Sequence, residues 1–278
     1  MMRQYPFKLV NVFAESHFGG NPLAVFSNAD DLNDEEMQLI ARQFNLSETV
    51  FFQAAADKSA VQKLRIFTPG YELPFAGHPT IGSAFVLKKL LGLSDDYVLQ
   101  TKSGLVEIRH QGDIITLALK NGVKTVSCTF SLTECAELLG LQTADILNAV
   151  WVDTGANQLL IRLTSESAVK NCQINTALFS QMLPNQLAYL WFVENNHAKV
   201  RLFFHANGTV AEDPGTGSAA ANLGGWAITQ GLTSIDWTIN QGDEMGRPNR
   251  LSLKVDENKT IFVGGRVIEV GEGVFNLP

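Results

Sequence analysis

Two similar stretches of sequence decide the fold: HPTIGSA at residues 78–84 and DPGTGSA at residues 213–219. Each stretch follows a strand-like run and opens a helical pattern, which predicts helices over residues 79–91 and 214–230. Glycines stand directly after both runs, at Gly92 and Gly231, where helices commonly end. The chain is therefore expected to contain two strand–turn–helix units of one kind.

Two further matches recur at nearly the same spacing and indicate an internal repeat. RIF at residues 65–67 is matched by RLF at 201–203, and GNPLA at 20–24 is matched by ANQLL at 156–160. A period near half the chain length means two copies of one fold, because solenoid repeats are far shorter. We expect one half over residues 1–122 and a second over 123–278, with a last strand that can pack back on the first half.

Short strand patterns alternate with short helices elsewhere in the chain. Capping boxes open helices at Asn33 and at Ser131, and the second helix is expected to end at Gly140. Turn residues at 110–113 and 256–259 predict hairpins. Strand-like runs cover residues 5–13, 22–26, 49–53 and 61–67. These features predict an α+β protein with mixed or antiparallel sheets.

The openings of the two long helices are candidate binding groups. Proline suits the first position of a helix, since its missing N–H would be unpaired there. His78 and Asp213, each just before a proline, then become equivalent N-caps. Asp213 also has an ordinary explanation as a cap, whereas His is not a preferred cap. If a pseudo-two-fold axis relates the halves, both N-termini point into one cleft and favour a carboxylate or an enolate oxygen.

Glu48 is the candidate acid or base. It stands where the polar segment 45–47 becomes the apolar strand 50–53, so partial desolvation of its carboxylate would suit proton transfer. The repeat projects Glu48 onto Pro184, so the acid is not duplicated. One base that removes a proton and returns it fits this asymmetry. The alternative is a solvated glutamate at a strand edge.

The composition excludes several classes of protein. The chain has 278 residues, 45% apolar and 18% charged, and its net charge of −7 argues against nucleic-acid binding. No apolar run is long enough for a membrane span and no signal-peptide core is present, so we expect a cytoplasmic protein without membrane contact. Three scattered cysteines indicate no disulfide framework, and the five histidines form no ligand pair, so no metal site is expected.

A series of motifs in order along the whole chain resembles the PhzF (phenazine biosynthesis-like) family. They are NVF at 11–13, GNP at 20–22, LSET at 46–49, FTP at 67–69, FAGHPT at 75–80, EDPGTGSA at 212–219, QG at 241–242 and MGRP at 245–248. The resemblance implies a diaminopimelate epimerase-like fold with two pseudo-symmetric halves. Each half would be a curved, mostly antiparallel sheet around a central helix, with the active site between the halves. It also implies a homodimer.

The resemblance also implies roles for the candidate residues. Glu48 would remove a proton from a carbon activated by an unsaturated acid and deliver it further along the conjugated system. His78 and Asp213 would orient polar groups of the substrate and assist proton movement. The residues that would hold the substrate carboxylate are Gly77, Gly215, Gly217 and Ser218. No metal or organic cofactor is implied.

We therefore interpret the chain as an isomerase that moves a proton on a small, cyclic and unsaturated carboxylate or amino acid. Related racemases use two cysteines at the helix openings, and the presence of His78 and Asp213 there excludes two-thiol chemistry. Two alternatives stay open: an epimerase of an acyclic amino-acid-like substrate, and a non-catalytic binding protein with the same fold. Arg247 contacts either an anionic substrate or a neighbouring strand, and His205 either lines the cleft or has no role.

Overall fold

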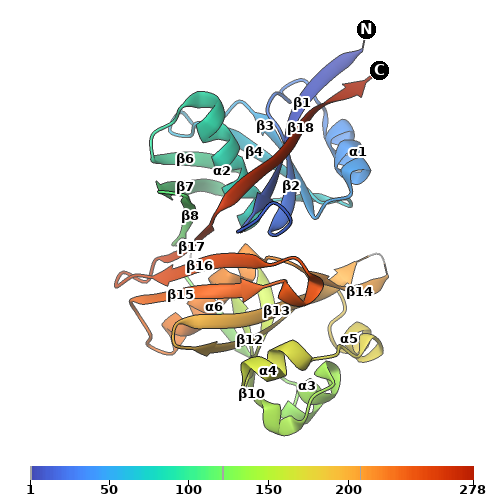
Figure 1. Cartoon of the computed structure of the whole chain (residues 1–278), viewed down its shortest axis with the longest axis vertical. Helices are drawn as coiled ribbons and strands as arrows, with labels where there is room; N and C mark the ends of the chain where they lie inside the picture. The colour runs from blue at the N-terminus through green and yellow to red at the C-terminus, as the bar shows by residue number, and fades with distance from the viewer. Residues whose placement is uncertain (1, 121, 207) are drawn as a thin grey trace. The chain divides into compact units, whose positions relative to one another are not determined.

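The computed structural model describes residues 2–120, 122–206 and 208–278, and the chain divides into two compact units (Figure 1). Unit 1 comprises Met1–Ala118 together with Gly264–Pro278, and unit 2 comprises Leu119–Val263. The C-terminal strand thus belongs to unit 1, where it pairs with the N-terminal strand along its length.

Unit 1 is a sheet that packs against two helices. Its strands are β1 (Arg3–Val12), β2 (Asn21–Phe26), β3 (Glu48–Gln53), β4 (Lys63–Phe67), β5 (Glu72–Leu73), β6 (Asp96–Thr101), β7 (Gly104–Gln111), most of β8 (Ile114–Leu119) and β18 (Val267–Leu277), and its helices are α1 (Asp34–Phe44) and α2 (Gly77–Leu91). Every residue of α2 from Gly77 to Ala84 is buried, so α2 is the central helix of this unit. The other face of the sheet packs against α1 through a cluster that includes Phe26, Met37 and Phe51.

Unit 2 repeats this plan with more helices around it. Its strands are β9 (Lys124–Ser127), β10 (Ile146–Asp153), β11 (Asn157–Leu163), β12 (Ala188–Glu194), β13 (His197–Ala206), β14 (Thr209–Asp213), β15 (Ile235–Gln241), β16 (Asn249–Val255) and most of β17 (Ile261–Gly265). Its α-helices are α3 (Leu132–Leu139), α4 (Glu166–Asn171), α5 (Thr176–Met182) and α6 (Gly217–Thr229). Two short 3-10 helices are η1 (Thr143–Asp145) and η2 (Asp243–Met245). All residues of α6 from Ala219 to Ala227 are buried, as expected of a central helix. The opposite face packs on α3, α4 and α5 through a second cluster that includes Leu159, Phe179 and Leu190.

The pairing of the strands follows one pattern in both units. In unit 1, β2 and β3 are parallel, β3–β4 and β4–β5 are antiparallel, and β6 returns parallel to β4 after α2. In unit 2, the corresponding pairs are β11–β12, β12–β13, β13–β14 and β13–β15, with the same directions. This confirms the predicted α+β class, with a mostly antiparallel sheet around a central helix in each half.

The local signals in the sequence explain several helix ends. Asn33 caps α1 and Ser131 caps α3, each in a complete capping box with the glutamate three residues later. Gly140 and Gly92 end α3 and α2 in the left-handed conformation that glycine adopts without strain. The predicted positions of these caps are therefore confirmed.

The predicted N-caps of the two central helices are wrong. Helix α2 begins at Gly77 with Ala76 as its N-cap, so His78 is the second residue of the helix. Helix α6 begins at Gly217 with Thr216 as its N-cap, so Asp213 ends strand β14 instead. Helix α6 also starts later than predicted, because the amide of Thr216 hydrogen-bonds to the side chain of Gln241 outside the helix.

The alignment of the repeat is also shifted near these helices. Arg65 and Glu72 are bonded across the β4–β5 hairpin at a sequence separation of 7, and Arg201 and Glu212 across β13–β14 at a separation of 11. The second hairpin is thus longer by four residues. In consequence Asp213 takes the place of Leu73, and not of His78, in unit 1.

The strand register also corrects the projection of Glu48. Phe67 pairs with Thr49, and its counterpart Phe203 pairs with Ala188. The residue in the place of Glu48 is therefore the one before Ala188, which is Leu187, and not Pro184. The conclusion that the acid is not duplicated is unchanged, since leucine carries no ionisable group.

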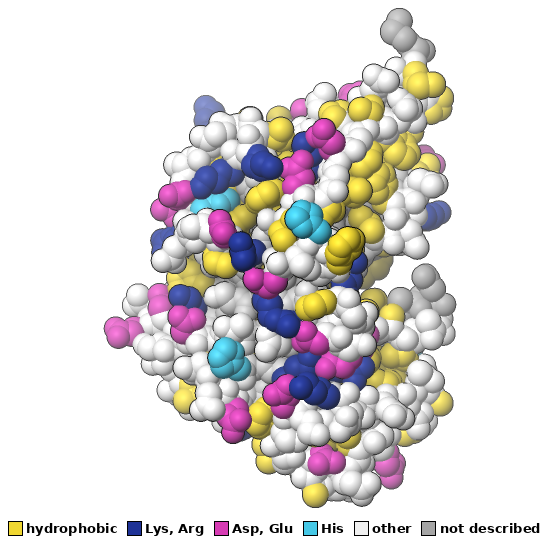
Figure 2. All heavy atoms as spheres, in the orientation of Figure 1, with side chains coloured by type: hydrophobic (Ala, Val, Ile, Leu, Met, Phe, Trp, Pro, Cys, Tyr) yellow, Lys and Arg dark blue, Asp and Glu magenta, His cyan; other side chains and the backbone are white. Residues whose placement is uncertain are grey.

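On the face seen in Figure 2, Lys and Arg side chains lie among Asp and Glu side chains, without a basic stripe. Among the helices of the described segments, none combines the length and apolar character that a bilayer crossing requires.

Candidate active site

Glu48 is the first residue of β3, beside Leu23 of the parallel strand β2. Its backbone position follows from the end of α1, where Asn45 turns the chain with a left-handed φ of 51°. The side chain is only 16% exposed, so its carboxylate is largely removed from bulk water. The prediction of a partly desolvated carboxylate at a strand end is confirmed by this geometry.

His78 lies next to Glu48 inside unit 1. The Nδ1 atom of His78 is 3.4 Å from Oε2 of Glu48, and the His78 residue is 6% exposed. The imidazole donates a hydrogen bond to the carbonyl of Pro22, while Nε2 has no hydrogen-bond partner among the described residues. The donor is therefore Nδ1, and Nε2 keeps its lone pair in the neutral ring.

The charge state of His78 follows from its burial. Desolvation lowers the pKa of His78 to about 3, against an ordinary value of 6.5, although the bond to Pro22 acts in the opposite direction. The ring is thus neutral at physiological pH. A neutral imidazole with a fixed tautomer can accept a hydrogen bond at Nε2.

Gly82 explains how α2 brings His78 so close to the strands. A Cβ atom at Gly82 would lie 2.5 Å from Leu23 Cδ2 and 2.9 Å from Val12 Cγ2. Only a residue without a side chain permits this approach of α2 to β1 and β2. The first turn of the helix, including Gly77 and His78, is held against β2 for that reason.

The predicted residues of unit 2 lie between the last residue of β14 and the first turn of α6. Asp213 is half-buried, and its Oδ2 accepts a hydrogen bond from the hydroxyl of Thr216. Gly215 is buried, and a Cβ atom there would lie 2.2 Å from Oδ1 of Asn249, so no side chain fits. Gly217 opens helix α6 and presents an N-terminal backbone amide.

Ser218 is oriented by a buried amide network. Asn222, which is fully buried, accepts bonds from Thr154 and donates to Oε1 of Gln158 at 2.9 Å. Gln158 must then present its Nε2 to Ser218, and it donates to the Ser218 hydroxyl at 3.0 Å. Within the described residues, the proton of this hydroxyl has no acceptor, so Ser218 can donate it to a ligand.

The helix positions also correct the predicted equivalence of His78 with Asp213. Because α2 starts at Gly77 and α6 at Gly217, the equivalent second residues are His78 and Ser218, not His78 and Asp213. Neither is a cysteine, and the three cysteines Cys128, Cys135 and Cys172 lie outside both helix openings. Two-thiol chemistry at these positions is therefore excluded on residue identity, as the sequence indicates.

Sequence reasoning missed the residues that orient the site. The carbonyl of Pro22 accepts a bond from His78, Gln158 donates to Ser218, and Asn222 fixes the orientation of Gln158. No local pattern connects these residues with His78 or Ser218. Gln241 lies in a recognised motif, but no pattern in the sequence connects it with Thr216. These contacts join segments that are far apart in the chain.

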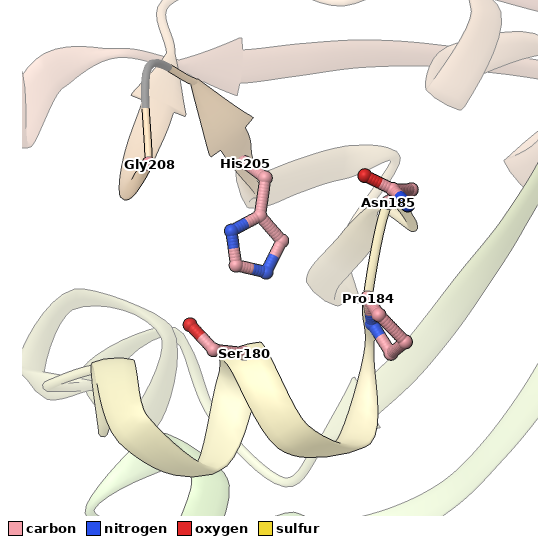
Figure 3. Close-up of a pocket in the computed structure, with 5 residues that line it drawn as sticks. All are labelled: Ser180, Pro184, Asn185, His205 and Gly208. Carbon is pink, nitrogen blue, oxygen red and sulfur yellow. The ribbon is translucent and has the colours of Figure 1, made fainter.

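His205 lies in a different part of unit 2. It lines a hollow of about 320 Å³ together with Ser180, Pro184, Asn185 and Gly208 (Figure 3). Its ring contacts Phe179 edge-on at 5.3 Å, and its Nε2 is buried without a partner among the described residues. Over those residues, no group of three His, Cys, Asp or Glu side chains has the geometry of a metal site.

Comparison with known proteins gives consistent results. The family model of phenazine biosynthesis-like proteins, PhzC-PhzF, matches residues 10–273. An uncharacterized isomerase from Pasteurella multocida is 58% identical over 278 residues, which cover 100% of this chain and 96% of the relative. The trans-2,3-dihydro-3-hydroxyanthranilate isomerase of Pseudomonas aeruginosa is 31% identical over 254 residues, covering 89% of each.

A solved structure supports the fold. The phenazine biosynthesis protein of the PhzF family from Bacillus anthracis superposes with a TM-score of 0.85 at 24% identity, over 99% of both chains. At that identity the likeness concerns the fold alone. Together with the pairing pattern in each unit, it confirms the expected two-part α+β fold of the diaminopimelate epimerase type.

Proposed function

Since the chain belongs to the phenazine biosynthesis-like (PhzC-PhzF) family and is an isomerase, we propose that it shifts a proton along a small unsaturated carboxylate or amino acid by general acid/base catalysis. No metal or organic cofactor takes part in the proposed reaction. The substrate is proposed to be cyclic, as in the Pseudomonas aeruginosa relative named for trans-2,3-dihydro-3-hydroxyanthranilate.

One observation carries this proposal: the single carboxylate of Glu48 lies 3.4 Å from the neutral ring of His78, and both are mostly buried. A desolvated carboxylate is a stronger base than one in water, because burial disfavours its charged form. In the proposed reaction Glu48 takes a proton from one carbon and returns it to another. His78 accepts a hydrogen bond from a polar group of the substrate at Nε2.

The role of holding the substrate falls to unit 2 in this proposal. Ser218 donates its free hydroxyl proton to the carboxylate, and the amide at Gly217 adds a donor at the N-terminus of α6. Gly77 and Gly215 are proposed to allow the backbone to approach the substrate closely. Asp213 is proposed to orient a polar group of the substrate and to assist the proton movement.

Incorporation of deuterium from solvent tests the proposal. The purified protein is incubated in D₂O with trans-2,3-dihydro-3-hydroxyanthranilate and with other unsaturated cyclic amino acids, and the products are followed by NMR. We expect label at one carbon, and a loss of roughly two to four orders of magnitude in rate for Glu48→Gln, the usual contribution of a general base. The exposed Glu35 provides the matched control, Glu35→Gln, which should leave the rate unchanged.

The outcomes separate the alternatives. Undiminished exchange in Glu48→Gln would remove Glu48 from the mechanism. Label at a single carbon with inversion of its configuration, on an acyclic amino acid, would favour an epimerase, although Leu187 in the place of Glu48 leaves unit 2 without a second acid at that position. Absence of exchange with every substrate tested would favour a binding protein.

A homodimer is also part of the proposal, on the basis of the family resemblance. The chain has a mass of 30.4 kDa, so sedimentation equilibrium should give about twice that value if the protein is a dimer. A mass equal to that of one chain at micromolar concentration would contradict this expectation.

A further inference from the structure

Thr216 connects Asp213 to the buried side chain of Gln241. The hydroxyl of Thr216 donates to Oδ2 of Asp213, and it accepts a bond of 2.9 Å from Nε2 of Gln241. Gln241 is fully buried, whereas Thr216 and Asp213 are half-buried. The three side chains therefore form one chain of hydrogen bonds inside unit 2.

The direction of this chain is fixed by the backbone. Oε1 of Gln241 accepts from the amide of Thr216 at 3.1 Å, and Nε2 donates to the carbonyl of Asp213 at 2.8 Å. A backbone amide can only donate and a carbonyl can only accept, so the side-chain amide of Gln241 has one possible orientation. The hydroxyl of Thr216 must accept from Nε2, and its own proton is directed to the Asp213 carboxylate.

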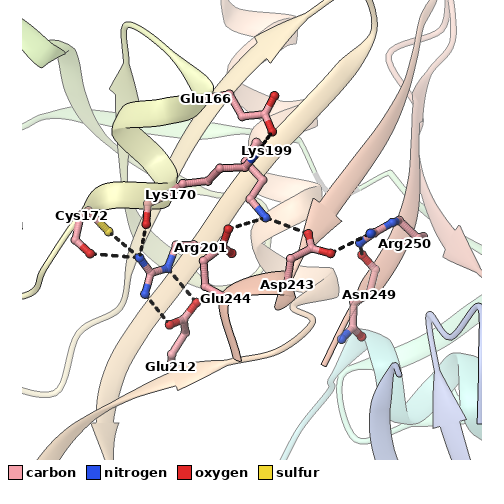
Figure 4. Close-up of polar contacts among 10 residues, drawn as sticks. All are labelled: Glu166, Lys170, Cys172, Lys199, Arg201, Glu212, Asp243, Glu244, Asn249 and Arg250. Carbon is pink, nitrogen blue, oxygen red and sulfur yellow. Dashed lines mark hydrogen bonds and ion pairs between the residues drawn. The ribbon is translucent and has the colours of Figure 1, made fainter. Parts of the chain in front are cut away.

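The two residues after Gln241, Gly242 and Asp243, hold this part of the chain in place. Gly242 has a φ of +78°, and a Cβ atom there would lie 2.6 Å from the carbonyl oxygen of Pro214. Asp243, in η2, is bonded to Nζ of Lys199 at 2.7 Å and to Arg250 at 2.7 Å (Figure 4). Lys199 is only 4% exposed, so this ion pair forms at a mostly buried position. The segment that follows Gln241 is thus held in place.

We propose that Thr216 and Gln241 are positioning residues, which hold the Asp213 carboxylate in one rotamer with a donor at Oδ2. The effect on turnover rests on the proposed function, in which Asp213 assists the proton movement. The effect on the Asp213 rotamer does not depend on it. Without the Thr216 hydroxyl, Nε2 of Gln241 loses an acceptor and Oδ2 of Asp213 loses a donor. The carboxylate is then held by one hydrogen bond fewer, and the bond that selects its present rotamer is lost.

The pair of variants Thr216→Val and Thr216→Ser tests whether the Thr216 hydroxyl holds the Asp213 carboxylate in its rotamer. Valine has nearly the shape of threonine without the hydroxyl, whereas serine keeps the hydroxyl. Crystal structures of both variants should show the Asp213 side chain in its original rotamer with Thr216→Ser and turned away with Thr216→Val. This readout needs no substrate, so it stands even if the proposed isomerase reaction fails in the wild type.

Kinetics provide the second readout where the wild type turns over. Thr216→Val should lower kcat by about 10²-fold with little change in KM, as expected when a reacting group is misplaced by about 1 Å, and Thr216→Ser should restore most of kcat. In a double-mutant cycle, Thr216→Val should add little to the effect of Asp213→Asn, because one acts through the other.

The results that would contradict the positioning role of Thr216 differ from those that would contradict the proposed isomerase reaction. An unchanged Asp213 rotamer in the Thr216→Val crystal would show that Thr216 does not position it. Independent, multiplicative effects of Thr216→Val and Asp213→Asn on kcat would do the same. A wild type that exchanges no label, with the rotamer turned in Thr216→Val, contradicts only the proposed function.

Discussion

Nδ1 of His78, from helix α2, lies 3.4 Å from Oε2 of Glu48, from strand β3, although the residues come from separate elements. The contact depends on the bond between the ring and the Pro22 carbonyl, which fixes the tautomer. It also depends on Gly82, which lets α2 approach the strands. The pairing of a carboxylate with a neutral imidazole is therefore a product of packing within unit 1.

The first prediction concerns the free nitrogen of His78. In His78→Asn, the side-chain amide can replace Nδ1 as donor to Pro22 but offers nothing in place of Nε2. We expect the thermal unfolding midpoint to stay close to that of the wild type, whereas label incorporation falls by about 10²-fold. His78→Ala should also fold, because His78 does not cap the helix.

Both variants are followed by calorimetry and by deuterium incorporation. An unfolded His78→Ala protein would make His78 a structural residue, and full activity in His78→Asn would leave no role for Nε2.

The second prediction concerns stability against pH. Burial lowers the pKa of His78 to about 3 and that of His110 to about 4, from an ordinary value of 6.5. Between pH about 6.5 and 4 the unfolded chain binds these protons and the folded chain does not, so the stability of the fold decreases as the pH falls. Each histidine contributes up to about 1.4 kcal/mol per pH unit in this range.

Urea unfolding at several values from pH 7 to pH 5 measures this slope, since most carboxylates stay ionised there. His78→Asn should have a shallower slope than the wild type. An identical slope in the two proteins would mean that His78 takes up a proton in the folded state, which would contradict a neutral ring.

The third prediction concerns the close approach of α2. Gly82→Ala places a Cβ atom 2.5 Å from Leu23 Cδ2 in a packed core, and overpacking of this kind costs about 1–3 kcal/mol. Alanine favours the helix by about 1 kcal/mol, so a net loss of up to about 2 kcal/mol is expected. Gly70→Ala is the control, since its Cβ atom would lie 3.9 Å from its nearest neighbour and should change stability by less than about 0.5 kcal/mol.

Denaturant unfolding of both variants measures the change in the free energy of unfolding. Equal stability of Gly82→Ala and the wild type would show that Leu23 moves aside without cost, and that the helix position does not depend on glycine.

Local features of the structure can be predicted from the sequence. Asn33, Ser131 and Gly140 act through bonds within one helix turn, so their roles are visible in a few neighbouring residues. The partial desolvation of Glu48 was predicted as well, since it follows from the change from polar to apolar residues.

Long-range features could not be predicted in the same way. The β13–β14 hairpin is four residues longer than the β4–β5 hairpin, which shifts the second copy of the repeat relative to the first. The similar sequences that begin at His78 and Asp213 therefore align these two residues, although His78 is structurally equivalent to Ser218. Proline at 214 suggested a helix start, yet the amide of Thr216 is bonded to Gln241, which is 25 residues away. Only the folded chain brings these groups together.

The last prediction concerns the ion pair beside Asp213. Arg201 donates to both carboxylate oxygens of Glu212, at 2.9 and 2.7 Å, and each side chain is 12% exposed. Glu212→Gln keeps the shape but leaves the guanidinium without its counter-charge, so we expect a loss of about 3–5 kcal/mol in the free energy of unfolding. Asp96→Asn removes the exposed partner of Arg109 and should cost less than about 1 kcal/mol, because water screens that pair. Chemical denaturation of the two variants measures both changes, and similar small losses in the two would show that Arg201 finds a sufficient partner in the carbonyl of Cys172, 3.0 Å away.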